Sequence, residues 1–475
     1  FTTITSKALP NDADTGISAN DFTRGQAFYD LVIEADPAND NILYVGGIDL
    51  FKSTNGAGSW SQLSHWYGGF GQPNNVHADQ HSIAFGNNDA SKVLFGNDGG
   101  IYYSGNSGSS IGSRNNNYNV TQFVKASIGP DGVGDLNGIF SAGAQDNGTQ
   151  AFRDANTANG INSSEELSDG DGFYTFVDKD GQYMIATYVN NVIYRFSLPW
   201  NGQGRIDGGA TTLSSDQSSG DFVNPMGYDS NANRLLSNKS TASSNAILSI
   251  NVASNSNGTL TNNALTASPT AFRASPFETN AWLIGLANGG LVKLTNVTNN
   301  SATFTTINNP FVGAVSSVRF GETVNDLIVT IHNYGVTSIW YSSNNGNSWT
   351  SKEGNLPNIP VRDFLLNPLA TNEAIIATQL GVWSTDNFND TNPNWSQSYN
   401  GMSDVSVTSL DYWNVSGDNV NNKIIASTYG RGVFTGTFTS TSVPDTEAPS
   451  TPTNLTSSNI TESSIEISWN ASTDN

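Results

Sequence analysis

The fold is decided by two neighbouring stretches, VRDFLL from Val361 and EAIIATQLGVW from Glu373 to Trp383. Each is made of short apolar runs, and Asn, Pro, Thr and Gly lie between them or within them. These polar and small residues favour turns, whereas short runs of β-branched and aromatic residues favour strands. We therefore expect three short antiparallel strands here, joined by tight turns.

The same pattern recurs along most of the chain. Comparable runs begin at Phe28 (FYDLVIEA), His81 (HSIAF), Val120 (VTQFVKA), Gly172 (GFYTFV), Phe222 (FVNPMGY), Ala271 (AFRAS), Val315 (VSSVRF) and Val407 (VTSLDYW). With Val361 these make nine starts, spaced by about 47 residues on average, and most are followed by a turn and further strands. Four short antiparallel strands per repeat of about 40–50 residues form the blade of a β-propeller. We predict an all-β chain with a single large propeller of about eight to ten blades, nine being counted.

The end of the chain has a different composition. Residues 439–452 (TSTSVPDTEAPSTP) are rich in Ser, Thr and Pro and indicate an extended linker. Residues 453–475 alternate as two strands. The predicted domains are therefore a propeller over 1–438, a linker over 439–452 and part of a second β-module over 453–475. We expect FTTITS, at Phe1 to Ser6, to pair into the last blade, because a propeller must close without an open sheet edge.

The charge and the cysteine content exclude several functions. The 475 residues include 41 Asp+Glu against 19 Lys+Arg, a formal charge of −22. Nucleic acids and anionic membranes both require basic residues, so neither is an expected partner. The chain has no cysteine, which excludes disulfides, thiolate zinc sites and cysteine nucleophiles. No apolar stretch approaches the ~20 residues that span a bilayer, and the absence of a Met at Phe1 suggests a processed, mature N-terminus.

Two segments share a short motif that ends in tryptophan. They are STNGAGSW from Ser53 and SNNGNSW, which lies in the frame YSSNNGNSW from Tyr341 to Trp349. Both resemble the Asp-box of bacterial neuraminidase (BNR) repeats, S-x-D-x-G-x-x-W, with Asn in place of Asp. The matching residues are Ser53, Asn55 and Trp60 in the first copy, where Ala57 replaces Gly, and Ser342, Asn344, Gly346 and Trp349 in the second. We expect a structural hairpin in which Asn caps the turn, Gly takes a positive φ and Trp packs between sheets.

A second set of motifs is ordered along the chain. These are HADQHSIAF (His77–Phe85), FGNDGGIYYS (Phe95–Ser104), GAQDNGT (Gly143–Thr149), DGDGFYTFVD (Asp169–Asp178) and STYGRGVF (Ser427–Phe434). They resemble a secreted Bacteroidetes family of sortilin-like or BNR-type propellers carried by the type IX secretion route. The resemblance covers about residues 25–438 and implies a secreted or outer cell-surface location. The tail from Asp445 to Asn475 resembles the opening of a bacterial fibronectin type III module, with Trp469 as its core tryptophan, so we expect the natural polypeptide to continue.

The first functional hypothesis is a binding protein that presents blade-face loops to a carbohydrate or protein partner. Exposed aromatic rings stack on sugars or anchor proteins. The Gly-rich insertion SHWYGGFGQPNN and the HADQH motif offer such side chains, namely His65, Trp66, Tyr67, Phe70, His77 and His81. An equally ordinary alternative is that the loop folds its aromatics onto its own propeller. A passive scaffold for a domain outside this segment is a further alternative.

The second functional hypothesis is a glycoside hydrolase acting on polysaccharide. Such enzymes need two carboxylates flanking the sugar bond, and polar residues just before the innermost strands of a propeller face a shared funnel. The carboxylates in such places are Asp30, Asp79, Asp146 and Asp171. The fold is similar to that of propeller xyloglucanases, whose Asp residues lie across a cleft between two propellers, whereas one propeller is evident in this sequence. The alternative is that these Asp residues cap turns.

A sialidase is disfavoured because its substrate carboxylate requires an arginine cluster. Its characteristic Arg-Ile-Pro motif is absent. The candidate arginines are scattered among the predicted blades, namely Arg24, Arg153, Arg273, Arg319, Arg362 and Arg431.

The sequence contains residues that could ligate zinc or calcium. His77 and His81 are four residues apart, but the central Glu of H-E-x-x-H is missing and the segment indicates a loop followed by a strand, so zinc catalysis is not expected. Structural calcium suits carboxylates in Gly-rich turns. Its candidate ligands are Asp98, Asp169, Asp171, Asp178 and Asp180. No other cofactor is required by either hypothesis.

Overall fold

The computed structural model contains β-strands and no helix in the residues it describes. These residues are 8–10, 21–68, 74–87, 89–116, 118–133, 136–152, 164–202, 204, 208–398, 401–402, 404–415, 418–439 and 450–472. The strands form many small antiparallel sheets, so the prediction of an all-β chain is confirmed. The expected pairing of Phe1–Ser6 lies outside the described residues, as does most of the linker.

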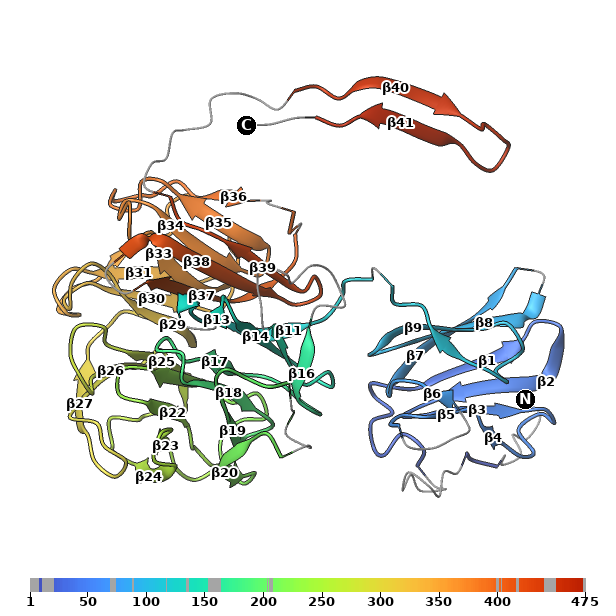
Figure 1. Cartoon of the computed structure of the whole chain (residues 1–475), viewed down its shortest axis with the longest axis horizontal. Coiled ribbons are helices and arrows are strands. Elements are labelled where there is room, and N and C mark those ends of the chain that lie inside the picture. Colours follow the sequence, from blue (N-terminus) through green and yellow to red (C-terminus); the bar gives the residue numbers. More distant parts are fainter. Residues whose placement is uncertain are drawn as a thin grey trace.

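The first two sheets form one unit, which we call the two-sheet unit (Figure 1, blue). The strands of its first sheet are β1 (Val32–Asp36), β2 (Asn39–Gly46), β3 (Leu50–Ser53) and β4 (Ser61–Gln62); those of its second are β7 (Gln80–Gly86), β8 (Asp89–Asn97), β9 (Gly100–Ser104) and β10 (Gly112–Ser113). A short parallel pair, β5 (Ser64–His65) and β6 (Asn74–Asn75), lies between them in sequence. The sheets share a buried core that includes Tyr44, Leu50, Val93 and Phe95.

The next seven sheets form a second body, which we call the seven-sheet unit (Figure 1, teal to orange). Its first four sheets are β11 (Phe123–Ile128), β14 (Phe140–Ala144), β15 (Thr149–Phe152), β16 (Glu165–Ser168); β17 (Thr175–Val177), β18 (Tyr183–Thr187), β19 (Asn191–Ser197), β20 (Thr211–Asp216); β21 (Met226–Asp229), β22 (Arg234–Asn238), β23 (Ile247–Asn251), β24 (Ser256–Leu260); and β25 (Pro269–Ala274), β26 (Trp282–Leu286), β27 (Leu291–Thr295), β28 (Thr303–Ile307). The last three are β29 (Val315–Phe320), β30 (Leu327–Ile331), β31 (Ile339–Ser342), β32 (Thr350–Ser351); β33 (Val361–Leu366), β34 (Ala374–Thr378), β35 (Gly381–Thr385), β36 (Ser396–Ser398); and β37 (Val407–Val415), β38 (Asp418–Thr428), β39 (Val433–Gly436). A hairpin of β12 (Asp131–Val133) and β13 (Leu136–Asn137) is inserted in the first sheet.

Contacts between first strands run through the seven-sheet unit and return to its beginning. Strand β11 contacts β17, β21 contacts β25, and the contacts continue through β29 and β33 to β37, which contacts β11. The remaining step, from β17 to β21, is made by Phe176 packing against Tyr228. The prediction of one ring of nine sheets is therefore wrong: the nine sheets divide into two and seven. The physical reason is that β11 buries Phe123, Ala126 and Ile128 against the last sheet, not against β7.

A repeated hydrogen bond accompanies these contacts. Thr270 Oγ1 donates to Val315 O at 2.7 Å, and Ser316 Oγ donates to Val361 O at 2.7 Å. Thr408 Oγ1 donates in the same way to Phe123 O at 2.8 Å, although the two residues are 285 positions apart. Each donor is the second residue of its strand, where a β-bulge shifts the register. The link between the last and first sheets thus repeats the link between consecutive sheets.

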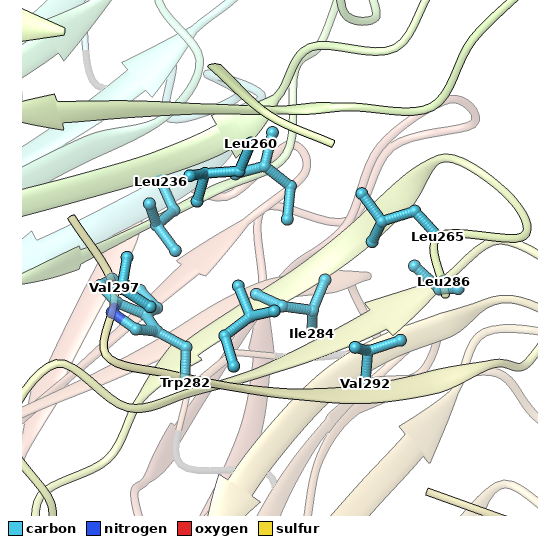
Figure 2. Close-up of a cluster of buried hydrophobic side chains, with 10 residues drawn as sticks. Leu236, Leu260, Leu265, Trp282, Ile284, Leu286, Val292 and Val297 are labelled. Atoms are coloured by element: carbon cyan, nitrogen blue, oxygen red, sulfur yellow. The ribbon is translucent and has the colours of Figure 1, made fainter. Parts of the chain in front are cut away.

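The core lies between neighbouring sheets. Leu236 of β22 and Leu260 of β24 pack with Trp282 and Ile284 of β26, all at most 2% exposed (Figure 2). Side chains on alternate positions of a strand face opposite sides, so each central strand contributes to two such cores. This arrangement explains why β18, β22, β26 and β30 are buried at almost every position.

The tail forms a separate hairpin of β40 (Thr453–Ser458) and β41 (Glu466–Asn470) (Figure 1, red). Both strands are exposed throughout, including Trp469. The two strands are present as predicted, whereas a fibronectin type III module stays a prediction.

Candidate functional site

Three carboxylates from three turns meet between the two units. Asp79 directly precedes β7, Asp98 lies in the β8–β9 turn, and Asp146 lies in the β14–β15 turn of the other unit. One carboxylate oxygen of each lies within 4.8 Å of the other two. We call these three residues the junction cluster. Asp79 is only 8% exposed and has no hydrogen bond from a described side chain, whereas Asp146 is exposed, so the cluster is open to solvent on the Asp146 side.

The backbone holds two of these residues in an unusual conformation. Asp79 has φ 65° and Asp146 has φ 56°, both in the left-handed region. Asp and Asn are the side chains that tolerate this region best after Gly, and such strain is concentrated at functional sites. The Asp146 N–H donates to Asp171 Oδ1 at 3.2 Å, which brings a fourth carboxylate from the strand-initiating DGDG segment next to the cluster.

Histidine and tyrosine side chains contact the cluster from the two-sheet unit. His81 Nε2 lies 2.5 Å from Asp98 Oδ1, and Tyr29 Oη donates to both oxygens of Asp98, at 3.0 and 2.9 Å. The rings of Tyr29 and His81 meet edge to face with centroids 4.9 Å apart. His77 Nε2 lies 3.3 Å from the backbone carbonyl of Asp146. Because a carbonyl oxygen only accepts, this nitrogen must be the donor, and the contact ties the two units together.

Burial and mutual repulsion shift the acidities of these groups in one direction. Burial raises the pKa of Asp79, and the Asp98 charge raises it further. Burial also raises the pKa of Asp146 to about 6, with added repulsion from Asp171 and Asp79. The pKa of Asp171 is raised by burial as well. Carboxylates this close titrate as a coupled group, so the group retains a proton at a pH where an isolated Asp is fully ionised.

A fifth acidic side chain, Asp30, interacts with the cluster through Asp79. Asp30 is 0% exposed, and neither of its carboxylate oxygens has a hydrogen-bond partner in the described structure. Burial raises its pKa to about 7, and repulsion from Asp79 adds to the shift. An ionised carboxylate without partners is costly in such a place, so Asp30 is expected to be protonated below neutral pH.

The structure brings together six of the residues predicted from the sequence. Asp79, Asp146 and Asp171 of the proposed acids, His77 and His81 of the proposed binding residues and Asp98 of the proposed calcium ligands all meet at this junction. Tyr29 was not singled out from the sequence. The signal that could have found it is its position beside Asp30, in the segment that leads into β1.

The predicted aromatic surface is only partly exposed. His65 is 1% exposed and its Nδ1 lies 3.0 Å from Gln62 Nε2, so its assignment as a binding residue is corrected to a buried structural one. Trp66 is half-buried, and its ring meets the 40%-exposed Tyr67 edge to face. Phe70 lies outside the described residues.

The predicted calcium ligands do not form one site. Asp178 is 0% exposed and accepts hydrogen bonds from the Gln182 N–H at 2.9 Å and from Tyr228 Oη at 3.1 Å. The prediction of Asp178 as a calcium ligand is therefore corrected: its carboxylate caps a turn. Asp169 and Asp180 join no group of potential ligands in the described residues, where the junction cluster has the spacing that could hold an ion.

The Asp-box residues form hairpin turns with matching hydrogen bonds. Ser342 Oγ accepts from the Gly346 N–H at 2.9 Å, and Asn344 Oδ1 accepts from the Ser348 N–H at 2.9 Å. The turns at Ser53–Ser59 and Ser104–Ser110 repeat both bonds. Trp349 packs on Phe311 of the preceding repeat, and Trp60 Nε1 donates to the Ala8 carbonyl at 2.7 Å.

Comparison with known proteins gives no family. Neither the scan against protein-family models nor the search of curated proteins found a match to this chain. In the described part of the chain, no helix is long and apolar enough to cross a membrane.

Proposed function

We propose that this chain is a glycoside hydrolase that cleaves polysaccharide at the junction cluster. The observation that carries the proposal is the convergence of Asp79 from one unit and Asp146 from the other, with carboxylate oxygens within 4.8 Å. Glycoside hydrolysis requires one carboxyl group that donates a proton and one that is ionised. Asp146, which is exposed and has a pKa raised to about 6, suits the proton donor. Asp79, whose backbone strain fixes its position, suits the second carboxylate.

The separation of the two groups favours one stereochemical course. Retaining glycosidases have carboxyl groups roughly 5–5.5 Å apart, whereas inverting ones leave about 6.5–9.5 Å for a water molecule. The junction cluster is close to the first range. We therefore propose a covalent glycosyl intermediate on Asp79 and products that retain the anomeric configuration.

The arrangement of the sheets supports a propeller scaffold for this activity. In the proposed fold the seven-sheet unit is a seven-bladed β-propeller, because its sheets contact one another in sequence order and the last contacts the first. The resemblance to propeller xyloglucanases implies aspartates between two units. The sequence alone suggested one propeller, whereas the described sheets form two units, of which the first has two four-stranded sheets. The resemblance to secreted Bacteroidetes propellers supports a location outside the cell.

The test is hydrolysis of a polysaccharide panel by the wild-type chain and by Asp79→Asn and Asp146→Asn. Reducing-end release is expected from at least one substrate, with a loss of at least 100-fold in each variant. The exposed Asp40→Asn, near the start of β2, is the matched control and is expected to retain full activity. Undiminished turnover in Asp146→Asn, with wild-type folding by circular dichroism, would rule out the assignment.

A divalent cation is the second candidate for the cluster. Two oxygen ligands of calcium, each at 2.3–2.6 Å from the ion, are at most about 5 Å apart, and the three oxygens here satisfy that limit. Calcium titration by calorimetry distinguishes the two functions. Tight binding that is abolished by Asp98→Asn, without hydrolysis of any substrate, favours a structural ion that joins the units. Retention of a polysaccharide without cleavage or calcium uptake favours the carbohydrate-binding function predicted from the sequence.

A further inference from the structure

A cavity of about 420 Å³ lies inside the seven-sheet unit and is lined by residues of all seven sheets. Five of its lining side chains are basic and three are acidic. They are Lys125, Lys179, Arg273, Arg319 and Arg362, and Asp229, Asp363 and Asp411. The whole chain has 19 basic residues and a formal charge of −22. The charge of the cavity lining is therefore opposite in sign to the net charge of the molecule. The arginines that are scattered in the sequence therefore converge in part here.

Two of the aspartates are fully engaged. Asp363 accepts from Arg319 Nη2 at 2.7 Å through both oxygens, and also from Ser317 Oγ and the Leu410 N–H. Asp411 accepts from Lys179 Nζ at 2.8 Å, and also from Ser127 Oγ and the Ile128 N–H. These bonds neutralise Arg319 and Lys179 and leave little capacity for a third cation.

The other basic groups have no carboxylate partner. Arg273 forms no hydrogen bond or ion pair with the described residues, and Lys125 is met by the rings of Tyr174 and Phe176, with Nζ 5.5 and 5.8 Å from their centroids. Arg362 donates only to Gln379 Oε1, at 3.2 Å, and its buried Nε has no partner. Asp229, the third aspartate, accepts from the Ala232 N–H at the end of β21. The side chains of Arg273, Lys125 and Arg362 are half-buried, and a charge that is withdrawn from water without an ion-pair partner is costly, so the cavity favours an anion.

The cavity lining runs along the first strands, from Arg362 near the start of β33 to Asp229 at the end of β21. Its lining includes the exposed Asn231 and Pro276, which follow the last residues of β21 and β25. Asp146, in contrast, follows β14, whose end pairs with the start of β11. No residue of the junction cluster lines the cavity, so the cavity is distinct from the proposed catalytic site.

We propose that this cavity binds a small anion through a carboxylate or sulfate group held by Arg273 and Lys125. The planar guanidinium fork matches both groups. A volume of about 420 Å³ falls in the range of small-molecule sites. The anion is therefore either a free inorganic oxyanion such as sulfate or an acidic monosaccharide such as a uronate.

The experiment is calorimetric titration of the whole chain with sodium sulfate and with sodium glucuronate, in a chloride buffer of constant ionic strength. Saturable binding of one equivalent is expected, together with a rise in the unfolding temperature. Arg273→Met is expected to weaken binding at least tenfold and Arg273→Lys less. Arg114→Met, which removes an exposed arginine of the two-sheet unit, is the control and is expected to retain wild-type affinity.

The outcomes separate the two sources and separate this site from the proposed function. Tighter glucuronate binding identifies an acidic sugar, and sulfate binding alone identifies an inorganic oxyanion. Asp146→Asn is expected to retain anion binding whether or not it loses hydrolysis. Absence of saturable binding of both probes, or unchanged binding by Arg273→Met, overturns the proposal. Should Arg273→Met not fold, Lys125→Met provides the same comparison.

Discussion

At the scale of single residues, the buried carboxyl groups near the junction decide how the protein responds to pH. Asp30 has no partner to stabilise its charge, and its pKa is raised to about 7. An unfolded Asp has a pKa of about 3.9. The raised folded-state value means that the stability contributed by protonated Asp30 is fully present below about pH 4 and is lost as the pH rises through 7.

The variant Asp30→Asn tests this linkage. It cannot ionise, so its free energy of unfolding is expected to depend less on pH between 5 and 8 than that of the wild type. Urea unfolding at several pH values measures the difference, and Asp40→Asn serves as an exposed control. A parallel pH dependence in wild type and Asp30→Asn would contradict the assignment.

The proposed acid gives a second pH-dependent prediction. Asp146 must be protonated to act on the leaving group, and its pKa is raised to about 6. The hydrolysis rate is therefore expected to fall as the pH rises above about 6. A pH profile of kcat/KM on the best substrate of the panel measures this limb, and a rate that keeps rising through pH 8 would exclude Asp146 as the acid.

At the scale of elements, the Asp-box turns show how a backbone requirement is met by different residues. Gly346 has φ 84°, and Ala57 takes the equivalent place in the first turn with φ 62°. A Cβ on Gly346 would lie 2.3 Å from Ile307 Cγ2. The left-handed conformation costs a non-glycine residue roughly 1–2 kcal/mol, so the first turn tolerates strain that the second avoids.

Reciprocal substitutions at these turns are expected to have opposite effects. Gly346→Ala should destabilise the protein by about 1–3 kcal/mol, because strain and a steric clash add. Ala57→Gly should stabilise it by up to about 1 kcal/mol, since relief of strain exceeds the added flexibility of the unfolded chain. Denaturant unfolding of both variants measures the two effects, and changes of the same sign would contradict this account.

At the scale of the whole molecule, two aspartates connect neighbouring sheets, and one of them, Asp411, joins the last sheet to the first. Asp363 joins β33 to Arg319 of β29 and to the backbone of β37, and Asp411 joins β37 to β11 and Lys179. The Lys179 ammonium and these hydrogen bonds hold the pKa of Asp411 well below its usual range despite its burial. Its contribution to stability is therefore present above about pH 4 and is lost on further acidification.

Removal of the Asp411 carboxylate is expected to lower the free energy of unfolding. Asp411→Ala removes the carboxylate partner of Lys179, which keeps its hydrogen bond to the Ile128 carbonyl, and leaves two donors at the closure without an acceptor, for which a loss of about 1–3 kcal/mol is expected. Lys423→Ala breaks an ion pair of similar exposure with Asp131 and should cost less than about 1 kcal/mol, because no other described hydrogen bond depends on that pair. Equilibrium unfolding of both variants provides the comparison, and equal effects would show that the closure does not depend on Asp411.

Much of this architecture could be predicted from local pattern. The sheets follow the apolar runs, and the strands that begin at Pro269, Val315, Val361 and Val407 keep a constant step of 46 residues. The division into two and seven could not be predicted, because the repeats look alike and closure depends on contacts such as Thr408 with Phe123. The acids at the junction stood out because each lies in a Gly- or His-rich turn, whereas the basic cavity draws on residues from separate repeats. Arg273, Arg319 and Arg362 gave no local signal of their convergence.

The hydroxyl-to-carbonyl bond that links Thr408 with Phe123 has a consequence for chain order. Since this bond is the same as those between consecutive sheets, the seven-sheet unit has no structurally privileged starting point. Asn119 Nδ2 already donates to the Arg431 carbonyl at 2.7 Å, so the two ends of the unit lie side by side. A circular permutant that joins these ends and opens the chain between β24 and β25 should therefore fold to the same architecture.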